Sequence, residues 1–144
     1  MKRTFVLMMV SLMMLACSEN PNAVTAQEQV QQVNDFVEVL YFHGKQRCIT
    51  CRSIEQNTKE LLDSLFAQQM QEGKVVYRVI DISKKKYEQI AEKYEVTWSS
   101  LILVHHEKGK ETAENLTEFA FGYSRTQPEV FKAGVSKKII QALK

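Results

Sequence analysis

Apolar residues gather in short segments along the chain, and their spacing separates expected strands from expected helices. Runs of β-branched and aromatic residues are typical of strands, whereas apolar residues that recur every three and four positions are typical of amphipathic helices. On these criteria the predicted strands are 37–42, 75–82, 100–105 and 115–121. The predicted helices are 27–35, 48–71 and 84–94, followed by a last helical region near the C-terminus.

Two local signals fall in that last helical region. Thr126 to Glu129 matches a capping box, in which the side chains of the first and fourth residues each bond a free backbone amide. Gly134 is expected to divide the region, and Ser136 is expected to cap a final short helix. The sequence therefore predicts two short helices here rather than one long helix.

The order of these elements predicts the fold class. Strands separated by helices are expected to run parallel, because a parallel connection needs a crossover that a helix supplies. The Lys108-Gly109 turn is expected to join the last two strands as an antiparallel hairpin at one edge. Residues 75–82 are apolar nearly throughout, as expected of a central strand covered on both faces. We therefore expect an α/β fold with a central mixed β-sheet of about four strands flanked by helices on both faces.

The amino-terminal segment has the features of a bacterial signal peptide. Lys2 and Arg3 precede an apolar stretch, residues 5–16, that is shorter than the roughly 20 residues needed to span a bilayer. The stretch runs into Met14-Leu15-Ala16-Cys17, which resembles a lipobox. We therefore expect residues 1–16 to be a lipoprotein signal peptide that is removed.

Lipidation of Cys17 would tether the mature protein to a membrane of the bacterial envelope, facing the periplasm. Cleavage after Ala26 is the alternative, although that site lies about ten residues beyond the apolar stretch. Residues 17–29 are polar and without periodicity, which indicates a flexible tether after the lipidated cysteine. Residues 30–144 are then expected to form one folded domain.

The balance of charge bears on the class of partner. The 144 residues include 19 Lys and Arg and 17 Asp and Glu. Removing Lys2 and Arg3 with the leader leaves 17 of each sign, so the mature protein is nearly neutral. Because nucleic-acid binding needs a clustered basic excess, we expect no nucleic-acid partner.

Cys48 and Cys51 are the only cysteines besides Cys17. In an exported protein a pair at this spacing is a local disulfide, a redox-active dithiol or two metal ligands. Cys48 follows a strand and a loop and is expected at the N-terminus of a helix. The helix dipole and the unpaired amides there stabilise a thiolate, which is the nucleophile in thiol–disulfide exchange.

Three basic side chains near the dithiol are further candidates for stabilising the thiolate of Cys48. Arg47 and Arg52 flank the cysteine pair. His43 ends the preceding strand, where it is a candidate proton shuttle or metal ligand, or else a solvated loop residue.

The pattern around these cysteines resembles the thioredoxin-like family. The matching segments, in the family's order, are Val39–His43, Cys48–Cys51, Val79–Asp81, Tyr94–Val96, Leu101–Val104, Lys108-Gly109 and Gly122. The resemblance implies a thioredoxin-like fold over residues 30–144. It also implies that Cys48 attacks a substrate disulfide, or is attacked by a substrate thiolate when the pair is oxidised. Cys51 would then resolve the mixed disulfide.

Residues 97–100 depart from the family's pattern. The family usually has a cis-proline packed against the dithiol, whereas this chain has Thr97-Trp98-Ser99-Ser100. Ser99, or alternatively Ser100, takes the position of the proline, and we expect a trans peptide because a non-proline cis bond costs about 3 kcal/mol. Trp98, Ser99 and Ser100 are expected to line the substrate groove. Ile49 and Thr50, between the cysteines, are expected to line it too.

Two more departures lie before the dithiol. The buried acid that assists proton transfer in thioredoxin would fall near Leu40, which has no ionisable group and cannot do this. The loop of residues 43–47 is longer than the family's loop and lacks the usual tryptophan before the first cysteine.

The predicted function is that of an envelope thiol–disulfide oxidoreductase without a cofactor or metal. Its expected partners are protein thiols or disulfides of the envelope, a membrane redox partner, and the membrane itself through the lipid. Two rival interpretations stay open. One is a metal-binding lipoprotein that uses Cys48, Cys51 and His43, and the other is a partner-binding module that keeps the fold without enzymatic activity.

Overall fold

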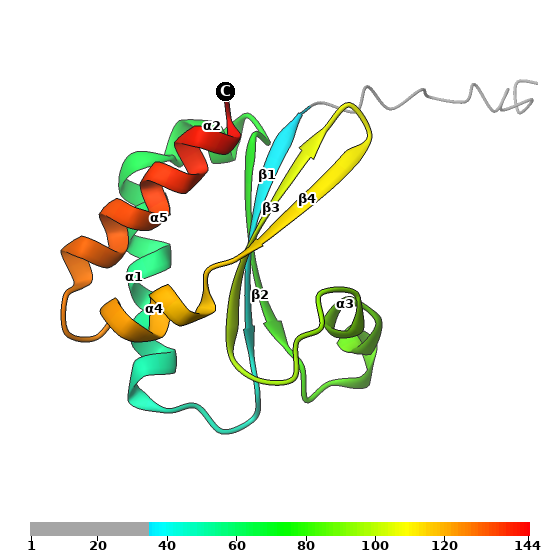
Figure 1. The fold of residues 1–144 in the computed structure, drawn as a ribbon, viewed down its shortest axis with the longest axis vertical. Coiled ribbons are helices and arrows are strands. Elements are labelled where there is room, and N and C mark those ends of the chain that lie inside the picture. The colour runs from blue at the N-terminus through cyan, green and yellow to red at the C-terminus, as the bar shows by residue number, and fades with distance from the viewer. Residues whose placement is uncertain (1–34) are drawn as a thin grey trace, which may run out of the picture. The chain divides into compact units, whose positions relative to one another are not determined.

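The computed structural model describes residues 35–144, which fold around one four-stranded β-sheet (Figure 1). The strands are β1 (Phe36–His43), β2 (Val75–Asp81), β3 (Ser100–Glu107) and β4 (Lys110–Asn115). The helices are α1 (Ile49–Leu65), α2 (Ala67–Gln71), α3 (Glu88–Lys93), α4 (Thr117–Tyr123) and α5 (Pro128–Ala142), with a 3-10 turn η1 (Lys85–Tyr87) before α3. Helices α1, α4 and α5 cover one face of the sheet and α3 lies on the other, which confirms the expected α/β class.

The predictions for the amino-terminal part fall outside the described residues. They are the signal peptide 1–16, the lipidated Cys17, the tether 17–29 and the helix 27–35, of which only Asp35 is described. Within residues 35–144, no helix combines the length and the apolar character needed to cross a membrane.

Strands β1 and β2 form the expected parallel pair, with α1 in the crossover between them. Val37 pairs with Val75 at one end, and His43 pairs with Asp81 at the other. The carboxyl ends of both strands therefore meet at one edge of the sheet, and the loop that leads to α1 leaves from that edge.

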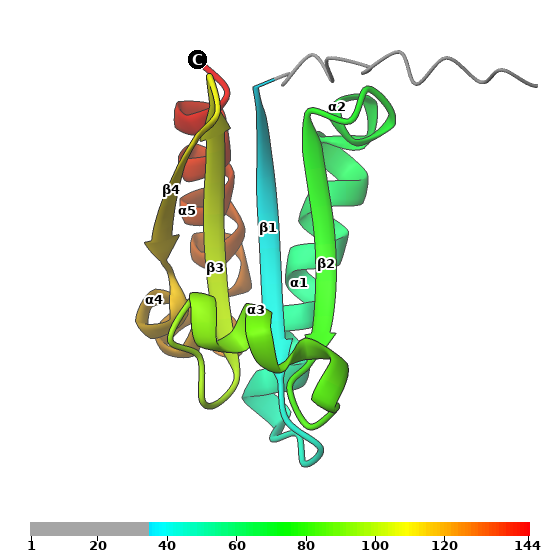
Figure 2. The same ribbon diagram turned by 90° about the vertical axis from the view of Figure 1, so that its right-hand side faces the viewer.

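Strand β3 runs antiparallel to β1, so our expectation of a parallel strand is wrong. Phe42 pairs with Ser100, and Phe36 pairs with His106. The connection through α3 stays near the edge where β2 ends (Figure 2), so the chain re-enters the sheet at that same edge. A parallel strand would have required the connection to return along the full length of the sheet.

The strand order β2-β1-β3-β4 also corrects the position of β2. We expected residues 75–82 to form a central strand, but β2 is an edge strand, and its Val79 is 39% exposed. The central strands are β1 and β3, in which the middle residues are buried on both faces.

The hairpin between β3 and β4 is present, but its second strand is not where we expected it. Lys108 and Gly109 both have positive φ angles, 49° and 77°, and make the turn as expected. Strand β4 is exposed throughout and polar except for Ala113, so it lacks the apolar run on which the prediction of 115–121 rested. The apolar residues of that segment belong instead to the region of α4, where Leu116 and Ala120, four positions apart, are buried.

Several helix boundaries differ from the predicted ones. The predicted helix 48–71 is two helices, because α1 and α2 are separated at Phe66. The predicted helix 84–94 is the 3-10 turn η1 followed by α3.

The last helical region is one helix, so both signals assigned to it are wrong. The N-cap of α5 is Gln127, which makes no side-chain cap, and Pro128 occupies the first turn, where its missing N–H costs nothing. Gly134 lies inside the continuous α5 and does not divide it. A glycine fits at this position because the ring of Phe119 occupies the space that a Cβ would need.

The buried side chains form two clusters, one on each face of the sheet. The larger cluster lies between the sheet and α1, α4 and α5, and includes Tyr41, Ile54 and Phe131. The smaller cluster lies on the face of α3, and its buried members are Leu40, Phe42, Ile80, Val96, Ile102 and Val104.

Candidate active site at the Cys48–Cys51 disulfide

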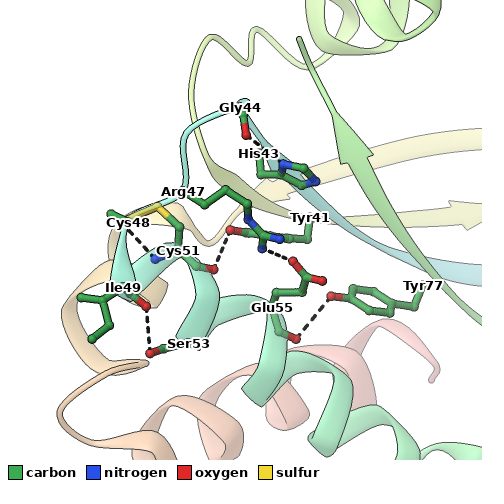
Figure 3. Close-up of polar contacts among 10 residues, drawn as sticks. All are labelled: Tyr41, His43, Gly44, Arg47, Cys48, Ile49, Cys51, Ser53, Glu55 and Tyr77. Carbon is green, nitrogen blue, oxygen red and sulfur yellow. Dashed lines mark hydrogen bonds and ion pairs between the residues drawn. A yellow bond between two sulfur atoms is a disulfide. The ribbon is translucent and has the colours of Figure 1, made fainter. Parts of the chain in front are cut away.

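Cys48 and Cys51 are joined by a disulfide at the start of α1 (Figure 3). Cys48 is the N-cap of the helix, with extended backbone angles of φ −71° and ψ 167°. Its Sγ accepts a hydrogen bond from the backbone N–H of Cys51 at 3.1 Å. The expected location of Cys48 at the amino end of a helix after a strand and a loop is therefore confirmed.

The two cysteines differ in their access to solvent. Cys48 is exposed, whereas Cys51 is buried, with only 6% of its surface exposed. A partner molecule can therefore approach the pair from the side of Cys48.

Tyr41 lies beneath the dithiol, at a position that the sequence analysis gave to Leu40. The Tyr41 hydroxyl donates a buried hydrogen bond of 2.6 Å to the backbone carbonyl of Cys51. Leu40 belongs to the smaller cluster on the opposite face, because neighbouring residues of a strand point to opposite faces. The assignment of the site-facing position to Leu40 is corrected to Tyr41.

The hydroxyl of Tyr41 stays protonated at neutral pH and so keeps its role as a donor. Burial raises the pKa of the Tyr41 phenol, and the neighbouring Arg47 and Ser99 oppose that rise. Phe42 of β1 pairs with Ser100 at the start of β3, so the segment before β3 lies next to the end of β1 from which the chain leads to the dithiol.

Arg47 is the one of the two flanking arginines that packs beneath the dithiol. Its guanidinium forms an ion pair with the Glu55 carboxylate and lies 5.7 Å from the centre of the Tyr41 ring. The side chains of Arg47 and Glu55 are only 24% and 30% exposed. Arg52 is exposed, one residue beyond Cys51.

Tyr77, on β2, completes the polar group below the cysteines. Its hydroxyl donates a long hydrogen bond of 3.5 Å to the backbone carbonyl of Glu55. Burial, reinforced by the negative charge of Glu55, raises the pKa of the Tyr77 phenol, which therefore stays neutral. We call Tyr41, Arg47, Glu55 and Tyr77 the Arg47 network (Figure 3).

Three members of the Arg47 network were missed by the sequence analysis. Glu55 had a usable signal, because it lies four positions after Cys51 and so shares its helix face. Tyr41 had a signal in the two-residue alternation of its strand. Tyr77 had none, since its contact with Glu55 joins residues 22 positions apart.

The residues predicted to line a groove divide between exposed and buried positions. Ile49 and Trp98 are 64% and 57% exposed, and Thr50 is half-buried. The Trp98 ring packs against Phe121 at a centroid distance of 5.1 Å.

Ser99 and Ser100 are buried. The Ser100 hydroxyl donates to the Trp98 carbonyl at 3.2 Å. Residues 35–144 contain no cis peptide bond, which confirms the expected trans geometry at this segment. The roles of these residues in substrate binding stay predictions.

His43 ends β1, and its ring lies 6.1 Å from the ring of Tyr41. Its Nδ1–H donates to the backbone carbonyl of Gly44 at 3.0 Å. In the part of the chain that the structure describes, no three His, Cys, Asp or Glu side chains are grouped so that they could hold a metal ion.

The topology and the site together decide the fold. A parallel β1-α1-β2 unit is followed by an antiparallel hairpin, and a Cys-x-x-Cys disulfide caps α1 at the carboxyl edge of the sheet. The fold is thioredoxin-like. This confirms the fold that the motifs implied.

Solved structures with which the chain can be aligned include two thioredoxin domains. A thioredoxin from Thermus thermophilus is 17% identical, with a TM-score of 0.46, over 74% of this chain and 72% of that chain. The Trx4 domain of ERdj5 is 19% identical, with a TM-score of 0.45, over 72% and 79% of the two chains. A protein described as malarial is 17% identical, with a TM-score of 0.38, over 60% and 92%. No protein-family model and no curated protein matches the sequence.

Proposed function

We propose that this protein is a thiol–disulfide oxidoreductase whose reactive group is the Cys48–Cys51 pair. The observation that carries the proposal is the asymmetry of the disulfide. One sulfur belongs to an exposed N-cap residue, and the other belongs to a buried residue one turn into the helix. A sulfur that is both reachable and stabilised as an anion is what exchange requires.

The proposed exchange proceeds through a mixed disulfide in either direction. When the pair is oxidised, a substrate thiolate attacks Sγ of Cys48, the Cys48–Cys51 bond breaks, and Cys51 leaves as a thiolate. A second substrate thiolate then attacks the substrate sulfur of the mixed disulfide, which forms the substrate disulfide and releases the Cys48 thiolate. When the pair is reduced, the Cys48 thiolate attacks a substrate disulfide and expels one substrate thiolate. Cys51 then attacks Sγ of Cys48, which restores the internal disulfide and releases the second substrate thiolate. Two electrons pass between the pair and the substrate in each cycle.

The start of α1 supports a thiolate at Cys48. The backbone N–H of Cys51 already points at Sγ of Cys48, and the helix dipole adds positive potential there. Such a position lowers a cysteine pKa from about 8.5 toward 7 or below. The guanidinium of Arg47 adds a positive charge nearby, whereas Arg52 contributes from the exposed side of the helix.

We further propose that the protein acts in the bacterial envelope as a lipoprotein anchored through Cys17. The proposal rests on the Met14-Leu15-Ala16-Cys17 sequence after a basic and apolar leader. Its substrates would be envelope protein thiols or disulfides, and a membrane redox partner would restore the pair. Labelling with a radioactive fatty acid tests the anchor, since label that persists in a Cys17→Ser variant would refute it.

The central experiment traps the mixed disulfide. A Cys51→Ala variant leaves Cys48 without its resolving partner, so we expect it to accumulate a covalent adduct with a disulfide-containing peptide on non-reducing gels. The wild type is expected to turn over without accumulating adduct, and Cys48→Ser is expected to form none. If Cys51→Ala reacts no faster than an unactivated thiol, and oxidised glutathione never oxidises the wild-type pair, the proposal fails.

A further inference from the structure

The side chain of Arg47 turns back beneath the dithiol instead of extending into solvent. Figure 3 shows it directed toward Tyr41 and Glu55. An arginine in an exposed loop would ordinarily keep its charged head in water. Here the head is held by two contacts: the ion pair with Glu55 and the face of the Tyr41 ring.

The residues that contact Arg47 belong to α1 and β1, which also position Cys51. Glu55 lies one helical turn after Cys51 on α1, and Tyr41 donates to the Cys51 carbonyl. Tyr77 in turn donates to the backbone carbonyl of Glu55. The position of the ion pair relative to the sulfur atoms is therefore set by contacts among α1, β1 and β2.

One donor of the guanidinium group is left unsatisfied in the oxidised protein. Nε of Arg47 is buried and has no hydrogen-bond acceptor among residues 35–144. A buried donor without an acceptor costs free energy, and a negative charge formed close by would offset that cost. Reduction of the disulfide creates such a charge on Cys48.

The two charges of the ion pair have opposite effects on the reduced protein. The positive charge of Arg47 stabilises the Cys48 thiolate, while Glu55 neutralises that charge and keeps the guanidinium turned toward itself. The side chains are partly removed from water, so these effects are screened less than they would be between exposed groups.

We propose that Glu55 is a positioning residue that sets the redox equilibrium of the dithiol by keeping the Arg47 guanidinium turned toward its own carboxylate and away from Cys48. This inference rests on the proposed exchange function. Reduction by glutathione consumes two thiols and yields one glutathione disulfide, the Cys48 thiolate, the Cys51 thiol and one released proton. Glu55 favours the oxidised side of this reaction, because it withholds part of the arginine's charge from the thiolate.

The test measures the equilibrium of the full chain with reduced and oxidised glutathione, in a Cys17→Ser background so that only two sulfurs react. In Glu55→Gln we expect the equilibrium to shift about tenfold toward the reduced form, which for a two-electron couple is about 30 mV. The rate of Cys48 alkylation, followed against pH, should report a lower pKa for Cys48 in that variant. Arg47→Gln should shift both quantities the opposite way.

The double variant asks whether Glu55 acts through Arg47. In an Arg47→Gln background, Glu55→Gln should shift the equilibrium by no more than about threefold, because only the direct charge effect remains. With Arg47 present, Glu55→Asp keeps the negative charge and should therefore keep most of the wild-type redox equilibrium. If Arg47→Gln fails to fold, Arg47→Lys tests the same hold, because a lysine cannot make the planar contacts of the guanidinium.

Asp63→Asn is the matched control. Asp63 is also on α1 and also pairs with a basic side chain, Lys59, but both side chains are exposed. Its removal should change the equilibrium less than twofold. A wild type that does not exchange with glutathione refutes the proposed function. A wild type that exchanges normally, with Glu55→Gln unchanged or equally effective without Arg47, refutes only the role of Glu55.

Discussion

The two faces of the sheet are covered very differently, and the dithiol lies on the more heavily covered one. Three helices, two of them 15 or more residues long, pack over the larger cluster. The six-residue α3 and its preceding turn cover the smaller cluster. Cys51 and Tyr41 belong to the first face, and Leu40, next to Tyr41, belongs to the second. The sulfur atoms are therefore positioned from the face that carries the larger cluster and the longer helices.

The largest expected effect compares the same truncation on the two faces. Phe131 and Phe42 are both fully buried, one in each cluster. Phe131→Ala should reduce the free energy of unfolding by about 4 kcal/mol and Phe42→Ala by about 3 kcal/mol, since a cavity under a short peripheral helix collapses more easily. Urea unfolding followed by circular dichroism gives both values.

The comparison breaks if Phe42→Ala proves the more costly of the two. That result would mean that a cavity under α3 collapses no more easily than a cavity under the three helices on the opposite face. The Cys48–Cys51 disulfide should be kept oxidised in both variants, so that a change of redox state is not mistaken for a packing effect.

A smaller effect is expected when one hydroxyl is removed from each face. The Tyr41 hydroxyl is buried against the Cys51 carbonyl, whereas the Tyr94 hydroxyl reaches the exposed Glu111 at 3.0 Å. Tyr41→Phe should cost about 2 kcal/mol, because it removes a buried hydrogen bond, and Tyr94→Phe should cost less than about 1 kcal/mol. Urea unfolding of the oxidised variants measures both. Equal losses would show that the site is no better buried than the surface of the other face.

The elements that the sequence predicted well are those with a strong local pattern. Strands β1, β2 and β3 were predicted within two residues at each end, because each contains a continuous run of mainly apolar residues. Strand β4 was missed because all six of its residues are exposed and all but Ala113 are polar, so that only its pairing with β3 makes it a strand. The direction of β3 was missed because it depends on where α3 lies in space.

The site shows the same division between local and distant information. The place of Cys48 at the start of a helix follows from the residues around it, and the structure agrees. The contact of Tyr41 with Cys51 requires the strand to be aligned with the helix, and that of Tyr77 with Glu55 joins positions 22 residues apart. Two predictions near the C-terminus were wrong for a related reason. Gly134 does not end a helix, because its missing Cβ accommodates the Phe119 ring of α4. Thr126 does not cap α5, because the helix begins with Pro128 after Gln127.

The smallest expected effect concerns how tightly the covering helices pack against each other. Gly134 of α5 lies against the ring of Phe119 in α4, so an added Cβ would collide with that ring. Gly122, also helical, has nothing within 4 Å of the same position. Gly134→Ala should therefore destabilise the fold by about 1 kcal/mol, the cost of overpacking less the gain in helix propensity. Gly122→Ala should stabilise it by about 0.5 kcal/mol, because only the propensity gain applies. Urea unfolding of the two variants decides the matter. If Gly134→Ala is the stabilising one, the Phe119 ring moves aside freely, and the close packing of the larger face does not extend to the contact between α4 and α5.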